Sequence, residues 1–437
     1  MKTSSIALFF ALMLPISLLG QDLKKGVEKD YPYLWDLYKH LHQNPELSFQ
    51  EKESSARMAK ELKDLGFEVT ENIGGYGVVG VFKNGEGPTV LVRTDTDGLP
   101  LKEDTGLPYS SKAMGLNDEG KEVPAMHACG HDVHMTVWVG AARQLVELKK
   151  SWKGTVVFIA QPAEERSGGS KHMLKEGLYE KFPKPDYCLA LHCSATLPAG
   201  TIGYKSGYAL ASVDMVDITV YGEGGHGAYP HTTIDPIVLA SRMVLDFQTI
   251  VAREIKPTEP AVVTVGSFHA GTKHNIIPSE AKLQLTLRSY SDEVRKQSIE
   301  ALKRISRGVA LSAGLPEDKM PKVVVADEST PSTYNTPSLV EKVVPELEKM
   351  MGKDKVVPVE SVMGGEDFAR YGKTADEIPI FMYWLGTVAP EKVAEAKAEG
   401  KTLPSLHSPF FAPDAEPSLQ TGVSSMTKAV LVLLGGK

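Results

Sequence analysis

The chain has 437 residues, of which 42% are hydrophobic and 24% are charged, and its net charge is −7. This composition is typical of a globular protein, and the length suits two domains better than one hydrophobic core. The excess of acidic residues and the absence of a long basic run argue against nucleic acid or an anionic membrane surface as the main partner.

The N-terminus has the pattern of a secretory signal peptide. Lys2 precedes an apolar stretch over residues 6–19, which ends at Gly20. A helix that spans a bilayer needs about 20 residues, so this stretch is too short to be one. We predict a signal peptide over residues 1–20, cleaved near Gly20, and a secreted or periplasmic protein. No cysteine directly follows the break, so we expect no lipid and no stable membrane anchor.

Residues 21–209 alternate between helix and strand patterns. Helical periodicity covers residues 34–42, 51–65 and 135–149. Apolar runs predict strands over residues 77–82, 89–93, 155–160 and 187–191. This alternation predicts an α/β fold in which helices cover both faces of a sheet.

Residues 210–332 break this rhythm and are predicted to form an inserted domain. Their expected order is strand, helix, strand, strand, helix, strand, which is the ferredoxin-like βαββαβ pattern. The predicted elements are strands 213–221, 261–268, 281–288 and 322–326 and helices 235–253 and 292–312. The α/β pattern resumes over residues 333–437, with a helix at 339–351 and a strand at 379–385. The first and last parts are therefore expected to form one catalytic domain.

Polar side chains follow three of the predicted strands. Asp95 and Asp97 come after the strand at 89–93, the pair Glu164–Glu165 after the strand at 155–160, and His192 after the strand at 187–191. Open α/β sheets place ligands at the carboxyl ends of their strands. We therefore expect these residues to share a site.

Cys129 and His131 add two softer ligands in a glycine-containing turn just before a helix. Cysteine, histidine and glutamate together are typical of a transition-metal site. One glutamate of the pair could bind metal while the other takes a proton from a water molecule that the metal activates. Asp95 and Asp97 could be oxygen ligands or could orient an imidazole. Paired glutamates are common on exposed helices. These two directly follow a buried strand and a proline, which favours a place in the site over an exposed helix face.

The cysteines do not indicate a disulfide framework. The chain has three, Cys129, Cys188 and Cys193, and the last two should lie on opposite faces of one strand. Cys129 is therefore better interpreted as a metal ligand.

Three other patterns in the sequence do not indicate a site. The string over residues 75–80 fits G-x-G-x-x-G but precedes a strand, so it is interpreted as a turn. No G-x-S-x-G motif supports a serine hydrolase. His40 and His42 precede a proline near a helix end, where surface or capping roles are expected.

Four motifs carry a resemblance to a known family. They are MHACGHD at 126–132, QPAEE at 161–165, GGHGAYPH at 224–231 and GGEDF at 364–368. From about residue 41 to residue 410, the chain resembles the hippurate hydrolases, aminoacylases and auxin-conjugate amidohydrolases, relatives of carboxypeptidase G. The resemblance implies a central mixed sheet like that of zinc exopeptidases and an inserted domain that acts as lid and dimer interface.

The resemblance also implies two divalent metal ions, zinc or manganese first, with cobalt and nickel as alternatives. The implied ligands are Cys129, His131, Glu165, His192 and His407. Glu164 would be the base and proton shuttle, and Asp97 would support the ligands. Asp95 stands where more distant peptidases have a histidine ligand, and its contact with metal is left open.

On the substrate side, the resemblance implies that His226 stabilises the oxyanion from the other subunit of a homodimer. Asn275 and Arg288 would hold a free carboxylate, which suits the bidentate geometry of arginine. Gly364 and Gly365 would offer backbone N–H groups.

The predicted function is hydrolysis of an N-acyl amino acid, a small-molecule substrate, to an acid and an amino acid. An exopeptidase that cleaves short peptides is one alternative, since it would use the same residues. A non-catalytic metal- or ligand-binding protein of the same fold is a second.

Overall fold

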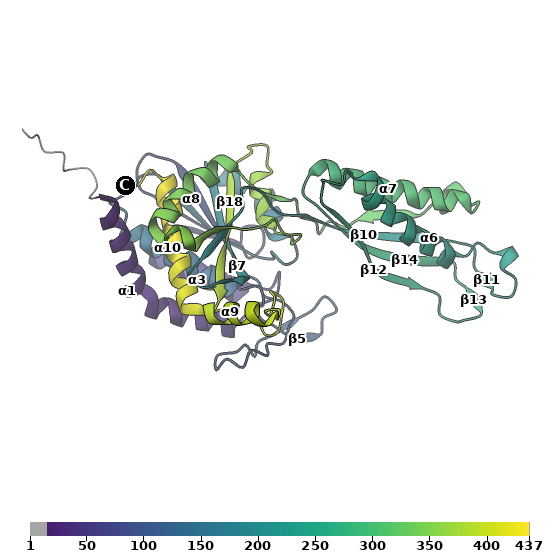
Figure 1. The fold of residues 1–437 in the computed structure, drawn as a ribbon, viewed down its shortest axis with the longest axis horizontal. Coiled ribbons are helices and arrows are strands. Elements are labelled where there is room, and N and C mark those ends of the chain that lie inside the picture. The colour runs from purple at the N-terminus through teal and green to yellow at the C-terminus, as the bar shows by residue number, and fades with distance from the viewer. Residues whose placement is uncertain (1–14, 437) are drawn as a thin grey trace, which may run out of the picture.

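The computed structural model describes residues 15–436, which form two bodies joined by extended segments (Figure 1). Of the predicted signal peptide, residues 1–14 lie outside the described residues. The first described helix, α1, runs over Pro15–Gln43 and so includes the predicted cleavage position. No helix of the described residues is long and apolar enough to cross a membrane.

The larger body is built on a mixed sheet of eight strands in the order β1-β2-β6-β3-β7-β18-β8-β17. Parallel pairs join β3 to β6 and β7, β7 to β18, and β8 to β17, and the other pairs are antiparallel. The strands are β1 (Glu68–Glu71), β2 (Val78–Lys83), β3 (Thr89–Asp95), β6 (Thr155–Gln161), β7 (Tyr187–Pro198), β8 (Ile202–Tyr204), β17 (Val356–Pro358) and β18 (Ile380–Val388).

Helices cover both faces of this sheet, because alternate residues of its apolar strands point to opposite sides. Val156 and Phe158 of β6 belong to one buried cluster, and Val157 and Ile159 belong to another. The first face carries α1, α2 (Lys52–Asp64), α3 (His131–Glu147), α8 (Pro337–Met351) and α10 (Ala415–Leu433). The second carries α4 (Gly169–Lys175), α5 (Leu178–Lys181) and the 3-10 segment η5 (Asp367–Gly372). The predicted α/β fold with a central mixed sheet is confirmed.

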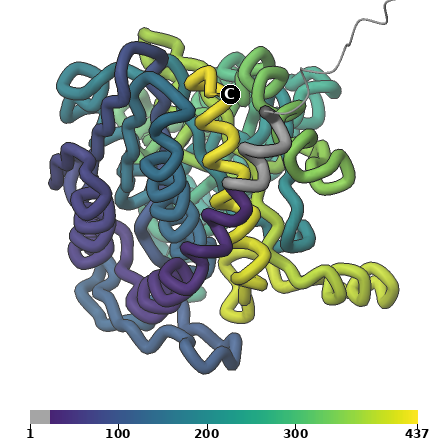
Figure 2. The backbone as a smooth tube through the Cα atoms, turned by 90° about the vertical axis from the view of Figure 1, so that its left-hand side faces the viewer, coloured from purple at the N-terminus to yellow at the C-terminus, as the bar shows by residue number. Residues whose placement is uncertain are grey.

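The first and last helices of the described chain lie side by side on one face of the sheet (Figure 2). α10 also packs against α3 and α8. No helix was predicted at this position. Short elements complete the larger body: the pairs β4 (Met114–Leu116) with β5 (Glu122–Pro124) and β9 (Gly207–Leu210) with β16 (Thr333–Asn335), the turn η4 (Lys353–Lys355) and α9 (Pro390–Glu399).

The smaller body has its own four-stranded antiparallel sheet, in the order β12-β14-β10-β15, and its own buried core. In chain order its main elements are β10 (Ser212–Tyr221), α6 (Pro236–Thr249), the π-helical η2 (Ile250–Glu254), β12 (Ala261–Ala270), β14 (Glu280–Ser289), α7 (Asp292–Ser312), η3 (Glu317–Lys319) and β15 (Lys322–Val325). Ser291 and Asp235 cap α7 and α6 through side-chain oxygens, which explains where these helices begin.

A small ribbon of β11 (Gly225–His226) and β13 (Ile276–Ile277), with the turn η1 (Pro230–Thr232), extends from the smaller body. It lies at the end farthest from the eight-stranded sheet (Figure 1).

Candidate metal centre

The five predicted metal ligands lie together in the larger body. Cys129 Sγ is 3.4 Å from His192 Nε2 and 3.3 Å from His407 Nε2. Donor atoms form two compact groups, Cys129–His131–His192 and Cys129–Glu165–His407, and within each group they all lie within 4.8 Å of one another. Because Cys129 belongs to both groups, these five side chains would be able to hold divalent metal ions.

Two unusual backbone conformations position these ligands. Gly130 has a φ of 82°, and a Cβ atom there would lie 2.8 Å from Cys193 Sγ, so the turn between Cys129 and His131 needs glycine. His407 also has a positive φ, 61°, and its N–H donates to Ala128 O at 2.9 Å. A distant loop is thus fixed against the Cys129 turn.

The ring nitrogens of the histidines are oriented by backbone carbonyls. His131 Nδ1 lies 2.8 Å from Asp97 O, and His192 Nδ1 lies 2.8 Å from Cys193 O. Each contact favours a proton on Nδ1 and leaves Nε2 free to bind metal. His192 lies within β7, because the strand is longer than predicted and continues beside β18.

Asp97 links two of the ligand residues. Its Oδ2 accepts from the Glu165 N–H at 3.0 Å and from the Ser48 hydroxyl at 2.7 Å, while its carbonyl faces His131. Asp97 therefore connects the backbone of Glu165 with the ring of His131.

Asp95 is held by neighbouring side chains. Its Oδ1 lies 2.7 Å from His134 Nδ1, and its Oδ2 accepts from Arg93 at 2.6 Å. His134 Nε2 in turn accepts from the Cys193 N–H at 2.8 Å. Burial lowers the pKa of His134 to about 4, which keeps the neutral ring that can accept this bond. Asp95 Oδ2 also lies 3.6 Å from His131 Nε2, and Asp95, His131 and His134 form a further group whose donor atoms could hold a metal ion.

The chemistry of the donor set fits divalent cations. His131 Nε2 and Glu165 Oε1 are buried and have no hydrogen-bond partner among the described residues. Burial, and then the nearby Glu165 and Glu164, raise the pKa of Cys129 well above its usual value. A buried cation would compensate this concentration of acidic groups and stabilise the thiolate.

Glu164 lies beside the ligands but faces a different set of neighbours. Its Oε2 is 3.9 Å from His131 Nε2, and it also forms a compact acidic group with Glu366 and Asp367. Burial, followed by Glu366, raises the pKa of Glu164 well above its usual value. The two adjacent glutamates therefore have different surroundings, since Glu165 faces His407 at 3.4 Å.

Arg93 organises this acidic group and was not predicted as a site residue. The fully buried guanidinium donates to Glu366 at 2.9 Å and to Asp367 at 3.1 Å, as well as to Asp95. A charged residue within an apolar strand indicates buried partners, and that signal was present in the sequence.

The prediction of a surface or capping role for His42 was wrong. Its side chain is buried, with Nδ1 2.6 Å from Asp132 Oδ2 and Nε2 3.1 Å from Glu103 Oε1. Burial alone would lower the pKa of His42, but the two carboxylates outweigh it and raise it to about 10. This network supports the start of α3, where His131 lies.

Three of the predicted substrate-binding residues meet at the junction of the two bodies. Ala211 N–H donates to Gly364 O at 3.0 Å. At Gly365, a Cβ atom would lie 2.2 Å from Val213 Cγ2 and 3.5 Å from Arg288 Nη1, so only glycine fits. The guanidinium of Arg288 is half-buried and has no hydrogen bond or ion pair among the described residues, and burial lowers its pKa.

The other two predicted residues, His226 and Asn275, are not brought to the centre within one chain. They are exposed neighbours in the distal ribbon, where the Gly227 N–H donates to Asn275 O at 3.0 Å. The ribbon lies at the opposite end of the molecule from β7 and β18 (Figure 1).

Comparisons with known proteins agree with this picture. The model of peptidase family M20/M25/M40 matches residues 91–431. Hippurate hydrolase of Campylobacter jejuni is 38% identical over 333 residues, which are 75% of this chain and 82% of the relative. Thermostable carboxypeptidase 2 of Saccharolobus solfataricus is 35% identical over 84% of this chain and 89% of its own length. N-acetyldiaminopimelate deacetylase of a Geobacillus species is 35% identical over 82% of this chain and 90% of its own length.

A solved structure supports the fold of the whole chain. The Bacillus subtilis YXEP protein, described as a dinuclear metal-binding peptidase of the M20 family, is 29% identical and superposes with a TM-score of 0.75. The comparison covers 94% of this chain and all of that one. The chain thus belongs to peptidase family M20/M25/M40, a family of metal-dependent enzymes that hydrolyse amide bonds.

Proposed function

We propose that this enzyme hydrolyses the amide bond of N-acyl amino acids and releases a carboxylic acid and an amino acid. The observation that carries the proposal is Arg288, a half-buried guanidinium without a partner among the described residues, next to Gly365. A half-buried guanidinium of this kind is suited to a bidentate contact with a carboxylate. Such a substrate has a free carboxylate adjacent to the bond to be cleaved.

Two divalent ions, zinc or manganese with cobalt and nickel as alternatives, would be held by Cys129, His131, Glu165, His192 and His407. When bound, they would lower the pKa of a water molecule and polarise the acyl carbonyl. Glu165 Oε1 and His131 Nε2, which have no hydrogen-bond partner among the described residues, would be free to bind these ions.

Glu164 would move the proton. Its carboxylate takes a proton from the attacking water as the oxygen bonds to the acyl carbon, and delivers it to nitrogen as the C–N bond breaks. The surroundings of Glu164 suit both steps: burial and Glu366 favour its protonated form, whereas Arg93 favours the carboxylate.

His226 and Asn275 would complete the site of a second copy in a homodimer. Val238 and Leu245 on the outer side of α6 are 54% and 70% exposed, and β12 is an edge strand of its sheet. Exposed apolar side chains and an unpaired edge are suited to association with another chain. His226 would then stabilise the oxyanion in the partner's site.

An exopeptidase that releases C-terminal residues is the second candidate. Two thermostable carboxypeptidases of Saccharolobus solfataricus are among the relatives at 35% identity. Peptides also end in a carboxylate, so Arg288 serves this candidate equally.

A substrate comparison tests both candidates. Enzyme loaded with zinc or manganese would be assayed with an N-acetyl amino acid, its C-terminal amide and a dipeptide of the same leaving residue. The proposal expects the highest kcat/KM for the N-acetyl amino acid and a large loss for the amide. A higher kcat/KM for the dipeptide would favour the exopeptidase. Equal kcat/KM values for the N-acetyl amino acid and its C-terminal amide would contradict the role of Arg288.

We also propose secretion or export to the periplasm after cleavage near Gly20. Leu23 and Val27 of α1 are buried in the main core, so this cleavage would leave the packed part of α1 in place. N-terminal sequencing of the exported protein tests it: a first residue well beyond Leu23 would contradict the proposed position.

A further inference from the structure

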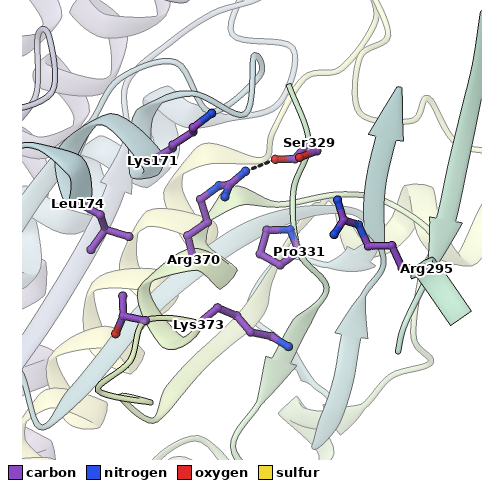
Figure 3. Close-up of a pocket in the computed structure, with 8 residues that line it drawn as sticks. Lys171, Leu174, Arg295, Ser329, Pro331, Arg370 and Lys373 are labelled. Atoms are coloured by element: carbon purple, nitrogen blue, oxygen red, sulfur yellow. Dashed lines mark hydrogen bonds between the residues drawn. The ribbon is translucent and has the colours of Figure 1, made fainter. Parts of the chain in front are cut away.

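A cavity of about 300 Å³ lies at the junction of the two bodies, outside the metal centre. Four cationic side chains line it: Lys171 of α4, Arg370 of η5, Lys373 just after η5, and Arg295 of α7 (Figure 3). The first three belong to the larger body and Arg295 to the smaller one. Ser329 and Pro331, from the segment that joins the bodies, form another wall.

The charges in this cavity are incompletely paired. Arg295 is neutralised by the buried Asp214, at 2.6 and 2.7 Å. Lys171 pairs with Asp327 at 2.5 Å and Lys373 with Asp292 at 2.9 Å. Arg370 has no carboxylate partner among the described residues and donates only to the Ser329 carbonyl.

Arg370 therefore has unused binding capacity. Its Nε is buried and has no hydrogen-bond partner among the described residues. Burial lowers the pKa of its guanidinium, so the charged form is incompletely compensated. An unpaired buried cation of this kind is stabilised by an anion that accepts its N–H groups.

The two lysines can turn toward such an anion. Asp327 and Asp292 are 92% and 61% exposed, so their ion pairs with Lys171 and Lys373 are surface pairs that contribute little stability. Either ammonium group can exchange its carboxylate for a ligand at small cost.

We propose that this cavity binds a small multivalent oxyanion of the phosphate class. The anion would accept hydrogen bonds from Arg370 and Lys373, with Lys171 of the same body close enough to line the cavity.

Inorganic phosphate is the probe. Thermal unfolding of the metal-loaded full chain would be followed across the millimolar range of phosphate, with sodium chloride keeping the ionic strength constant. A ligand that binds only the folded state raises the Tm in a saturable way. The variant Arg370→Gln should raise the apparent Kd for phosphate about tenfold or more, because a charge-assisted hydrogen bond is lost.

Two further variants keep the test decisive if Arg370→Gln does not fold. The double variant Lys171→Gln/Lys373→Gln should also weaken the response. Lys184→Gln should not, since Lys184 pairs with Asp376 outside the cavity. A general salting effect of phosphate would raise the Tm of all variants equally and would overturn the proposal.

Amide hydrogen exchange locates the binding. Phosphate should protect residues 326–332 and 367–374, which surround the cavity, in the wild type but not in the double variant. Protection confined to the Cys129 and His407 segments would show phosphate at the metal centre instead and would contradict the proposal.

Discussion

The Sγ atom of Cys129 and the Nε2 atom of His407 lie 3.3 Å apart, although 278 positions separate the two residues in the sequence. The His407 N–H also donates to the carbonyl of Ala128, directly before Cys129. The loop that carries His407 is thus fixed to the turn before α3. The metal centre is complete only when these two segments meet, so its assembly depends on the whole fold.

Cys129→Ser is expected to lower the metal content of the purified protein. A serine hydroxyl is a poorer ligand than a thiolate, and Cys129 is common to both donor groups. Elemental analysis of metal per chain measures the effect. Cys188→Ser is the matched control. Cys188 is also a buried free cysteine, but it lies in the hydrophobic core and belongs to neither donor group. Equal metal content in both variants would refute the ligand role of Cys129.

Mixing two inactive variants is expected to restore activity if sites form across a homodimer. Glu164→Gln removes the proton-transfer group from the larger body of one chain, and His226→Ala removes the oxyanion-binding group from the distal ribbon of the other. A mixed dimer contains one site with both residues intact, so an equal mixture of refolded or coexpressed chains should reach about one-quarter of wild-type activity. If each site were complete within one chain, the mixture would stay as inactive as its components.

Arg288→Met is expected to raise KM for N-acyl amino acids by about tenfold or more, because a charge-assisted contact is lost. The effect should be small for the corresponding C-terminal amides, which have no carboxylate. Steady-state kinetics with both substrates separates a lost contact from a damaged fold. Arg295→Met provides a comparison, since Arg295 is bound to Asp214. Equal losses for the acid and the amide would contradict the assignment.

His42→Asn is expected to destabilise the protein by about 3–5 kcal/mol, because Asp132 and Glu103 would lose their buried partner. The folded state raises the pKa of His42 from 6.5 to about 10. The stabilisation by protonated His42 is therefore fully present below pH 6.5, declines as the pH rises, and is lost near pH 10. Urea unfolding of wild type and variant across this range measures it.

The exposed His40 on the same helix gives the control for this pH profile. His40→Asn should leave the free energy of unfolding within the small range of surface substitutions. A difference between wild type and His42→Asn that stays constant from pH 6 to about 10 would contradict the raised pKa.

The sequence predicted five of the eight strands of the large sheet, because apolar runs and the polar side chains after them are local patterns, but it missed the short strands β1, β8 and β17. α10 was missed for a physical reason. Gly422 and Ser425 are small residues buried within it, and a Cβ at Gly422 would lie 2.5 Å from Val137 Cγ2. Close packing selects small residues there and hides the apolar periodicity of the helix.

Long-range partners explain the other differences. His42 has the local pattern of a helix end, and only Glu103 and Asp132 make it a buried cation. His407 was assigned by resemblance alone, because no spacing connects it to Cys129. Asp95 contacts His134, which is 39 positions away, and no local pattern connects the two residues.

The metal content and turnover of Glu164→Gln test the central claim most directly, because Glu164 should move the proton while its neighbour Glu165 binds metal. We expect Glu164→Gln to retain wild-type metal content and to lose about 10²–10⁴-fold in kcat. Glu165→Gln should lose both metal and activity. Near-wild-type turnover in Glu164→Gln, or loss of its metal, would contradict this division of roles.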